Sequence, residues 1–215
     1  MSRKRYFRTE HDAGDHKVTR YQEFRGELCT RQIEVSQGRW RFAWQSPDLR
    51  NPLIADVPLS TLALTEASAI TRQAFDDAWA TAQARGRHTL IAAMPWEDGA
   101  CCAQAVRVGR TVMVAGISAT DDHGQVVGLG DAYAQTVFIL QRIERALHQV
   151  GAAPEDIVRT RVFVTATASL PDVRRAHAEF FAGIRPVTTL AVVQSLAMPG
   201  LLVTIEADAL IASAD

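Results

Sequence analysis

The fold of the C-terminal half is decided by residues 103–116, which read AQAVRVGRTVMVAG. Valine recurs at every second position on both sides of Gly109-Arg110, and this period is typical of half-buried strands. We therefore expect strands at 103–108 and 111–117, joined by a tight turn. A short third strand is expected at 125–127.

Two amphipathic helices and three more strands are expected beyond this hairpin. Apolar side chains recur at intervals of three and four residues from 131 to 150, which predicts a helix that Asp131 caps and Gly151 ends. The order βββαβαββ is an α+β fold in which both helices cover one face of a sheet. The other face then needs a cover, for which a partner subunit is the natural candidate. The second helix is expected at 171–181, and the strands at 157–165, 188–193 and 201–210.

The N-terminal part has a different residue pattern from the Val- and Ala-rich second half, and we place the domain boundary at Pro95–Gly99. Residues 1–26 are polar and charged and predict a loose leader with at most one short strand. A hairpin is expected at 27–45, and a helix from Thr71 to Gly86. The prediction is a hairpin-plus-helix module at 1–95 followed by a second domain at 96–215. Its small core is expected to contain Trp40, Phe42, Trp44 and Trp79.

The composition is that of an ordinary globular protein. The chain has 215 residues, of which 47% are apolar and 22% charged, and this balance excludes disorder, collagen and coiled coil as descriptions of the whole chain. Lysine and arginine number 23 against 24 acidic residues, giving a net charge of −1. Such a balance creates no long-range field to recruit nucleic acid or an acidic membrane, so neither is an expected partner.

The cysteines and the N-terminus predict a reducing, cytoplasmic setting. The chain has three cysteines, an odd number, and adjacent Cys101 and Cys102 cannot bridge each other without strain. The basic start of the chain is not followed by the apolar core of a secretory signal. No apolar run reaches the roughly 18 residues of a spanning helix.

Several segments of the second half follow one another in a familiar order. They are the strand pair at 103–109 and 112–116, Gln135 near the start of the long helix, DIVRTRVFV at 156–164, Phe180-Phe181, PVTT at 186–189 and IEADA at 205–209. Together they make residues 100–212 similar to the reactive-intermediate deaminase (Rid, or YjgF-like) superfamily. Residues 1–95 lie outside this resemblance.

The resemblance implies a chorismate-mutase-like α+β fold that assembles as a homotrimer, with the sheets facing inward and three ligand clefts between neighbouring subunits. It also implies a small-molecule substrate, an imine or enamine that is hydrolysed to a keto compound and ammonia. No cofactor or metal is expected in such a cleft.

The resemblance implies that a glutamate in the last strand positions the attacking water, and this glutamate is Glu206 here. Partial desolvation beside an apolar cleft would suit this carboxyl to moving protons at neutral pH. The alternative is a structural glutamate that backbone N–H groups satisfy, or that pairs with a neighbouring arginine. Thr188, Thr189 and Gly116 are expected to line the same cleft.

The sequence departs from the family pattern where the family binds a carboxylate. The family has an arginine two residues after the cleft proline, and this chain has Thr188, a neutral hydroxyl that cannot replace a bidentate guanidinium. Arg174 and Arg185 are candidate replacements, with solvated surface charges as the alternative. Two further departures are Ala115 in place of a serine and Cys102 in place of a tyrosine.

Three other groups have a candidate role and a structural alternative. His177, one turn after Arg174, could shuttle a proton or be an ordinary surface histidine. Cys102 could line the cleft or be a buried structural thiol, and two adjacent cysteines are an incomplete set for a metal. The pairs His11-Asp12 and Asp15-His16 contain metal-ligand types, but we expect them in a solvated segment.

Two hypotheses for function follow. The first is an enzyme acting on a small unsaturated nitrogen compound, by hydrolytic deamination or by a related water addition, tautomerisation or cyclisation. The second is a non-catalytic trimer that binds a small ligand or a partner. Thr188 and Ala115 favour the second hypothesis, and Glu206 favours the first.

Overall fold

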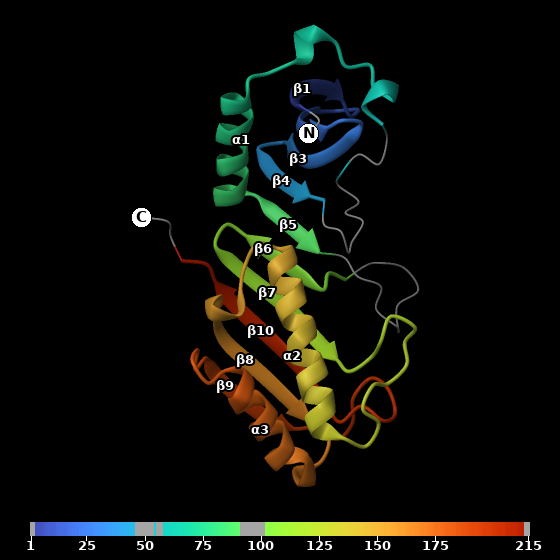
Figure 1. Cartoon of the computed structure of the whole chain (residues 1–215), viewed down its shortest axis with the longest axis vertical. Helices are drawn as coiled ribbons and strands as arrows, with labels where there is room; N and C mark the ends of the chain where they lie inside the picture. Colours follow the sequence, from blue (N-terminus) through green and yellow to red (C-terminus); the bar gives the residue numbers. More distant parts are fainter. Residues whose placement is uncertain (1–2, 46–53, 55–57, 91–101, 213–215) are drawn as a thin grey trace. The chain divides into compact units, whose positions relative to one another are not determined.

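The structure is a computed structural model that describes residues 3–45, 54, 58–90 and 102–212 (Figure 1). Contacts divide the chain into two units, Met1–His88 and Thr89–Asp215, which are taken in turn. The boundary expected at 95–99 lies outside the described residues.

The first unit contains a meander of four antiparallel strands. Neighbouring strands pair in sequence order, and β4 also pairs in parallel with β5 through Arg41 and Arg87. The hairpin expected around residues 36–38 is confirmed. Gln37 and Gly38 both have positive φ, 49° and 73°, as the two-residue turns that match strand twist require. The strands are β1 (Lys4–Asp12), β2 (Lys17–Arg25), β3 (Leu28–Ser36), β4 (Arg39–Trp44) and β5 (Arg87–Leu90), which contains the boundary between the units.

The expectation of a loose leader at residues 1–26 is wrong. This segment forms β1 and β2, two nine-residue strands paired along their whole length from Lys4/Arg25 to Asp12/Lys17. Its apolar residues are few but divided between two small cores, with Tyr6 against one and Phe7 against the other. Ladder hydrogen bonds and cross-strand charge pairs hold the strands where apolar alternation is weak.

Helix α1 (Arg72–Arg85) packs on one face of this meander, as expected. The Thr71 hydroxyl accepts a hydrogen bond from the Ala74 N–H, and Gly86 ends the helix. The predicted aromatic core is confirmed. The core contains Ile33, Phe42, Phe75, Ala78, Trp79 and Ala82, with Trp40 and Trp44 packed against it. Two 3-10 turns, Leu59–Thr61 and Glu66–Ser68, precede α1.

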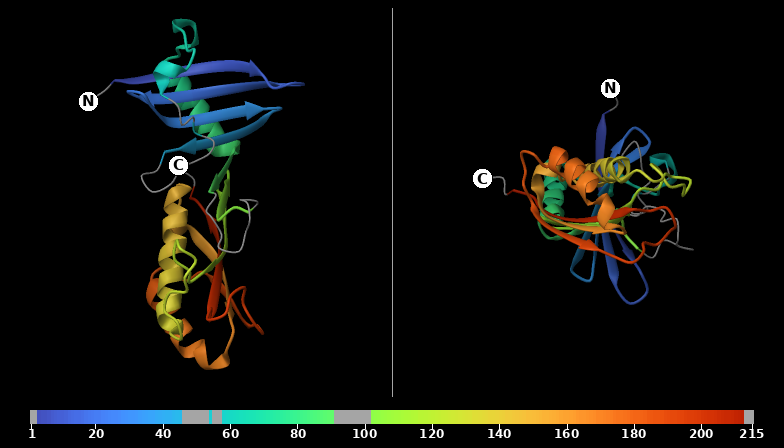
Figure 2. Two further views of the ribbon diagram at one scale, coloured as in Figure 1. Left: turned by 90° about the vertical axis from the view of Figure 1, so that its right-hand side faces the viewer. Right: turned by 90° about the horizontal axis from the view of Figure 1, so that it is seen from below.

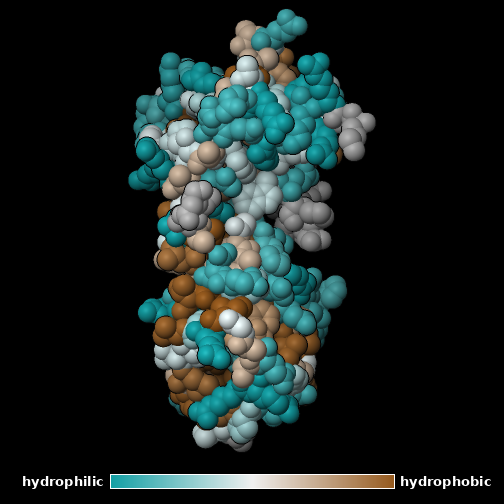
Figure 3. Space-filling model, turned by 60° about the vertical axis from the view of Figure 1, so that its left-hand side comes forward, coloured by the Kyte–Doolittle hydropathy of each residue, from teal (hydrophilic) through white to brown (hydrophobic). Residues whose placement is uncertain are grey.

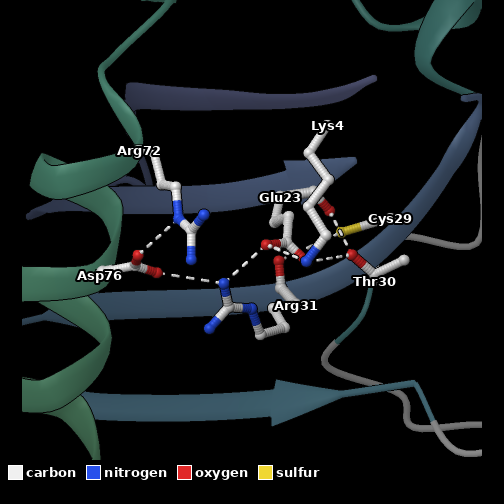
Figure 4. Close-up of polar contacts among 7 residues, drawn as sticks. All are labelled: Lys4, Glu23, Cys29, Thr30, Arg31, Arg72 and Asp76. Atoms are coloured by element: carbon white, nitrogen blue, oxygen red, sulfur yellow. Dashed lines mark hydrogen bonds and ion pairs between the residues drawn. The ribbon is translucent and has the colours of Figure 1, made fainter. Parts of the chain in front are cut away.

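A buried charge cluster joins α1 to the meander (Figure 4). The Glu23 side chain is 2% exposed and accepts hydrogen bonds from Arg31 at 2.6 Å, Thr30 at 2.7 Å and Lys4 at 3.1 Å. Arg31 also donates to Asp76 at 3.2 Å. Burial alone would raise the pKa of the Glu23 carboxyl, but the hydrogen bonds from these donors outweigh it and lower that pKa to about 2.

The second unit is one mixed sheet with two helices. The strands lie in the order β6-β7-β10-β8-β9, and only β8 and β9 run parallel. The helices cover one face of this sheet (Figure 2), so the α+β prediction for this unit is confirmed. The elements are β6 (Ala105–Val108), β7 (Thr111–Ser118), α2 (Ala132–Gln149), β8 (Ile157–Val164), α3 (Leu170–Phe180), β9 (Val187–Val192) and β10 (Val203–Leu210), with 3-10 turns at Pro154–Asp156 and Thr167–Ser169.

The expectation of a third strand at 125–127 is wrong. Only an isolated bridge between Thr120 and Val126 forms there. The Asp121 carboxylate accepts the N–H groups of His123 and Gln125, and these bonds close the segment into a turn.

Buried polar groups fix the ends of α2. Gln135 is fully buried, donates to the carbonyls of Gly128 and Gly200, and accepts the N–H of Leu202 at 2.8 Å. It thereby ties the start of α2 to the loop that leads into β10. At the other end, Arg107 donates to the Val150 carbonyl at 3.0 Å. In the part of the chain that the structure describes, no helix combines the length and apolar character needed to cross a bilayer.

Replacing Glu23 by glutamine should destabilise the first unit at neutral pH and change its response to acid. The folded pKa lies below the ordinary value of 4.5, so the stabilisation is present above about pH 4.5 and is lost as pH falls toward about 2. We expect Glu23→Gln to lower the free energy of unfolding by about 2–3 kcal/mol at pH 7 and to flatten its decline between pH 4.5 and 2. Urea unfolding followed by tryptophan fluorescence measures both effects.

The matched control is Glu10→Gln, because Glu10 is an exposed carboxylate paired with exposed Arg8. It should change stability by less than about 1 kcal/mol. Equal losses of unfolding free energy in the two variants would show that the buried Glu23 stabilises the unit no more than an exposed ion pair does.

Candidate functional site

Strand β10 has side chains on both faces of the second sheet. One face is covered by α2 and α3, and the other is open (Figure 2). Its buried side chains are Val203, Ile205, Ala207 and Ala209, and the intervening Thr204, Glu206 and Asp208 are partly exposed. Because successive side chains point to opposite faces, Glu206 lies on the face that α2 and α3 leave open.

Glu206 belongs to a charge quartet, which we define as Arg159, Arg161, Glu206 and Asp208. Arg161 donates to Glu206 at 3.2 Å and to Asp208 at 3.1 Å, and Arg159 lies 3.9 Å from Asp208. The Glu206 side chain is 37% exposed. Of the two structural interpretations of Glu206 given above, the structure contains the pairing with a neighbouring arginine, and it lies within one chain. A catalytic role for Glu206 stays a prediction.

A β-bulge in β7 opens one flank of Glu206. Ile205 pairs with Ile117 and Ala207 with Val114, so Ala115 and Gly116 together face Glu206. A Cβ atom on Gly116 would lie 3.9 Å from Glu206 Cγ. A side chain at this position would therefore contact both Thr204 and Glu206.

Thr189 lies on the same open face. It pairs with Arg161 in the parallel β8–β9 ladder, and Arg161 pairs in turn with Glu206. The structure therefore brings three of the predicted site residues, Glu206, Thr189 and Gly116, to one surface.

Thr188 is expected beside Glu206, but successive strand residues point to opposite faces, and within one chain Thr188 lies with His177 on the helix-covered side. His177 Nε2 is 3.0 Å from the Thr160 hydroxyl oxygen, which is 2.9 Å from that of Thr188. Thr160 is fully buried and Thr188 is exposed. Burial lowers the pKa of His177 below its ordinary value of 6.5, which favours the neutral ring at neutral pH.

Among the described contacts, no bond joins Arg174 or Arg185 to these groups. Arg174 is exposed on α3, and within the described ranges no hydrogen bond or ion pair joins it to Glu206 or Thr188. Arg185 is exposed, with a left-handed backbone (φ 55°) and its N–H bonded to the Phe181 carbonyl. Cys102 is exposed and precedes β6, and Cys101 lies outside the described residues.

Sequence reasoning missed Arg159, Arg161, Asp208 and Thr160. A signal was present, because Arg159-Thr160-Arg161 and Glu206-Ala207-Asp208 each place two like charges on one face of a strand. Opposite charges on two predicted strands indicate cross-strand pairing, provided that the strands are neighbours.

The two histidine–aspartate pairs lie at the turn between β1 and β2. His11 and Asp12 end β1, and Asp15 pairs with His16 at 2.7 Å in the turn before β2. Over residues 3–45, 54, 58–90 and 102–212, no group of three or more metal-ligating side chains is assembled.

Exposed apolar side chains gather on the second unit. Figure 3 shows brown side chains on this unit, whereas the first unit is mostly teal in that view. Met113 is 60% exposed, Val187 67% and Leu210 47%. Register places all three on the open face that carries Glu206, which is therefore an unpartnered surface with a charged centre.

Comparisons with known proteins identify the second unit. The sequence pattern of a family described as Endoribonuclease L-PSP matches residues 100–211. An uncharacterized Streptomyces coelicolor protein is 38% identical over 115 residues, which are 54% of this chain and 85% of that protein. The 3-aminoacrylate deaminase RutC of Acinetobacter baylyi is 33% identical over 82 residues, which are 38% of this chain and 65% of that protein.

Solved structures agree. A Mycobacterium tuberculosis member of the YjgF/YER057c/UK114 family is 41% identical with a TM-score of 0.52, over 59% of this chain and 100% of that one. A Rid family protein from Yersinia pestis, YyfA, is 27% identical with the same TM-score of 0.52 and the same coverage of 59% and 100%. The family match begins at residue 100, so the first unit is unassigned.

Gly116 should tolerate alanine, because nothing in the backbone requires glycine there. Its φ is not in the left-handed region, and the nearest atom to an added Cβ, Thr204 Cγ2, is at an ordinary 3.5 Å. We expect Gly116→Ala to change the free energy of unfolding by less than about 1 kcal/mol. Thermal unfolding checks this.

The control is Gly128→Ala. Gly128 has φ +64°, and its added Cβ would lie 3.1 Å from Ala134 Cβ, so a loss above about 1 kcal/mol is expected. An equal loss at Gly116 would mean that its backbone, rather than the space beside Glu206, demands glycine.

Proposed function

Because this chain belongs to the Rid/YjgF family described as Endoribonuclease L-PSP, we propose that it hydrolyses a small imine or enamine, with Glu206 handling the proton of the attacking water. The observation that carries this proposal is the placement of Glu206. Its carboxylate is ion-paired, partly open to water, and flanked by the glycine of the β7 bulge.

Hydrolysis of a C=N bond needs few protein groups. Water adds to the carbon of a C=N bond, a carbinolamine forms, and its collapse releases a carbonyl compound and ammonia. An ionised carboxylate held by Arg161 can accept the proton of the water and return it to the leaving nitrogen. The deaminase relative named above acts on 3-aminoacrylate, which is an enamine of this class.

RNA cleavage is a poorer match to this chain. The net charge is −1, and the quartet on the open face is balanced between two arginines and two carboxylates. Phosphate backbones are bound by an excess of cationic side chains. A small ligand suits this surface better.

The complete site requires two copies of the chain. Thr188 and Glu206 lie on opposite faces of one sheet, and β8 separates their strands. Two strand spacings are about 10 Å, so one small ligand cannot contact both side chains of a single chain. We propose a homotrimer that closes through the exposed open face, with Met113 and Val187 as apolar contacts, and in which Thr188, on the edge strand β9 of a neighbouring copy, completes the site around Glu206.

A non-catalytic trimer that binds a ligand or a partner is the second candidate. Thr188 favours it, because a neutral hydroxyl replaces the guanidinium that the family uses for carboxylates. Turnover separates the two candidates.

Glu206→Gln should abolish deamination while leaving the fold intact. Glutamine keeps the shape but cannot accept a proton, and we expect kcat to fall at least about 100-fold. The assay is keto-acid and ammonia release from 2-aminoacrylate generated in situ. The control Glu179→Gln, on the surface of α3, should retain wild-type kcat. Wild-type turnover that survives Glu206→Gln contradicts the role of Glu206.

Co-expression of two inactive chains tests the shared site. In a 1:1 mixture of Glu206→Gln and Thr188→Val chains, about a quarter of the sites between neighbours in a closed ring combine an intact Glu206 with an intact Thr188. Activity should therefore return to about a quarter of the wild-type value. No return of activity, or a sedimentation mass of one chain, would overturn the shared site.

A further inference from the structure

Three polar side chains from three elements form a continuous row, which we call the hydroxyl row. It runs from His177 on α3 through Thr160 on β8 to Thr188 on β9, with separations of 3.0 and 2.9 Å. Thr160 is fully buried, and Thr188 reaches the surface. The row therefore connects a half-buried imidazole to an exposed hydroxyl through a group that water does not reach.

The row has two proton arrangements on the same heavy atoms. In one, His177 Nε2–H donates to Thr160, Thr160 donates to Thr188, and Thr188 donates to the Pro186 carbonyl at 3.2 Å. In the other, Thr188 donates to Thr160, and Thr160 donates to an unprotonated Nε2. Each hydroxyl has one proton and accepts readily, so both arrangements are complete.

The surroundings of His177 favour a neutral ring, in which Nε2 accepts when the ring proton is on Nδ1. Its ring packs 4.5 Å from the Phe181 ring, and burial keeps the imidazole neutral. In the tautomer protonated on Nδ1, Nε2 has no proton and can act as a base through the two hydroxyls.

We propose that the hydroxyl row is a second proton-transfer route of the site, in which Thr188 contacts the ligand and His177 receives the proton through Thr160. This proposal rests on the proposed function and deepens it. Thr188 is the catalytic residue of the row, and Thr160 and His177 act through it. The ligand group that Thr188 accepts a proton from must itself carry a proton, and a hydroxyl on the reacting carbon is such a group.

The step balances for a protonated imine. Water attacks carbon, Glu206 takes a proton of the water, and a neutral carbinolamine forms. The C–N bond then breaks as Glu206 returns that proton to nitrogen and ammonia leaves. The carbinolamine O–H gives its proton to Thr188, Thr188 gives its own to Thr160, and Thr160 gives its own to Nε2. His177 ends as the imidazolium and releases one proton to solvent, while the carbonyl product forms.

Thr160→Val breaks the row with a side chain of the same shape. General acid–base catalysis contributes about 10²–10⁴ in rate, so kcat for an imino acid should fall about 100-fold while KM changes less than about threefold. Thr160→Ser restores the hydroxyl and should recover most of the lost kcat. The control Thr136→Val removes another fully buried hydroxyl, bonded to the Ala132 carbonyl within α2, and should leave kcat unchanged.

His177→Gln supplies the second arm. An amide can hydrogen-bond to Thr160 but cannot take a proton, so kcat should fall as in Thr160→Val, and the double variant should lose no more than either single variant. Circular dichroism confirms folding.

The outcomes separate the two proposals. Turnover by the wild type with kcat unaffected in Thr160→Val, or parallel changes in kcat and KM, overturns the hydroxyl row and leaves the proposed function standing. A wild type that turns over no imine overturns the proposed function, and the row with it.

Discussion

The two-residue period of β10 is the constraint on which the second unit depends. Its buried positions, from Val203 to Ala209, pack under the helices, and its partly exposed positions carry Glu206 and Asp208. A slip of one residue would bury two carboxylates and expose the core, so the hydrophobic pattern fixes the register strongly. The position of the candidate acid–base group is therefore a consequence of core packing.

The fold of the second unit follows from local patterns, and that of the first does so only in part. Valine alternation and the stripe of α2 place nearly every element between 103 and 212, because burial of one face dominates their energetics. The pattern fails at β1 and β2, where cross-strand partners such as Lys4 and Glu23 stabilise the pairing. A charge pair between two residues 19 positions apart, one on each strand, leaves no periodic signal in either strand.

The candidate site shows the same division between local and non-local information. Glu206 and Gly116 could be predicted from motif and strand position, since each depends on its own segment. Their partners could not. Arg161 meets Glu206 across 45 residues of sequence, and Thr160 meets Thr188 across 28, because β8 pairs with both β10 and β9. Only the register of three strands reveals these contacts.

The ion pair of Glu206 with Arg161 explains how an acidic side chain can lie among exposed apolar side chains. Covering the open face by another copy would remove water from the charge quartet, and an unpaired carboxylate there would cost several kcal/mol. Arg161 bonds to Glu206 and Asp208, so the charge is already balanced before any partner arrives. The exposed Met113 and Val187 around it can then supply apolar contact area without leaving a buried charge unpaired. In the proposed assembly, the arginine that holds the carboxylate in place also makes its enclosure energetically tolerable.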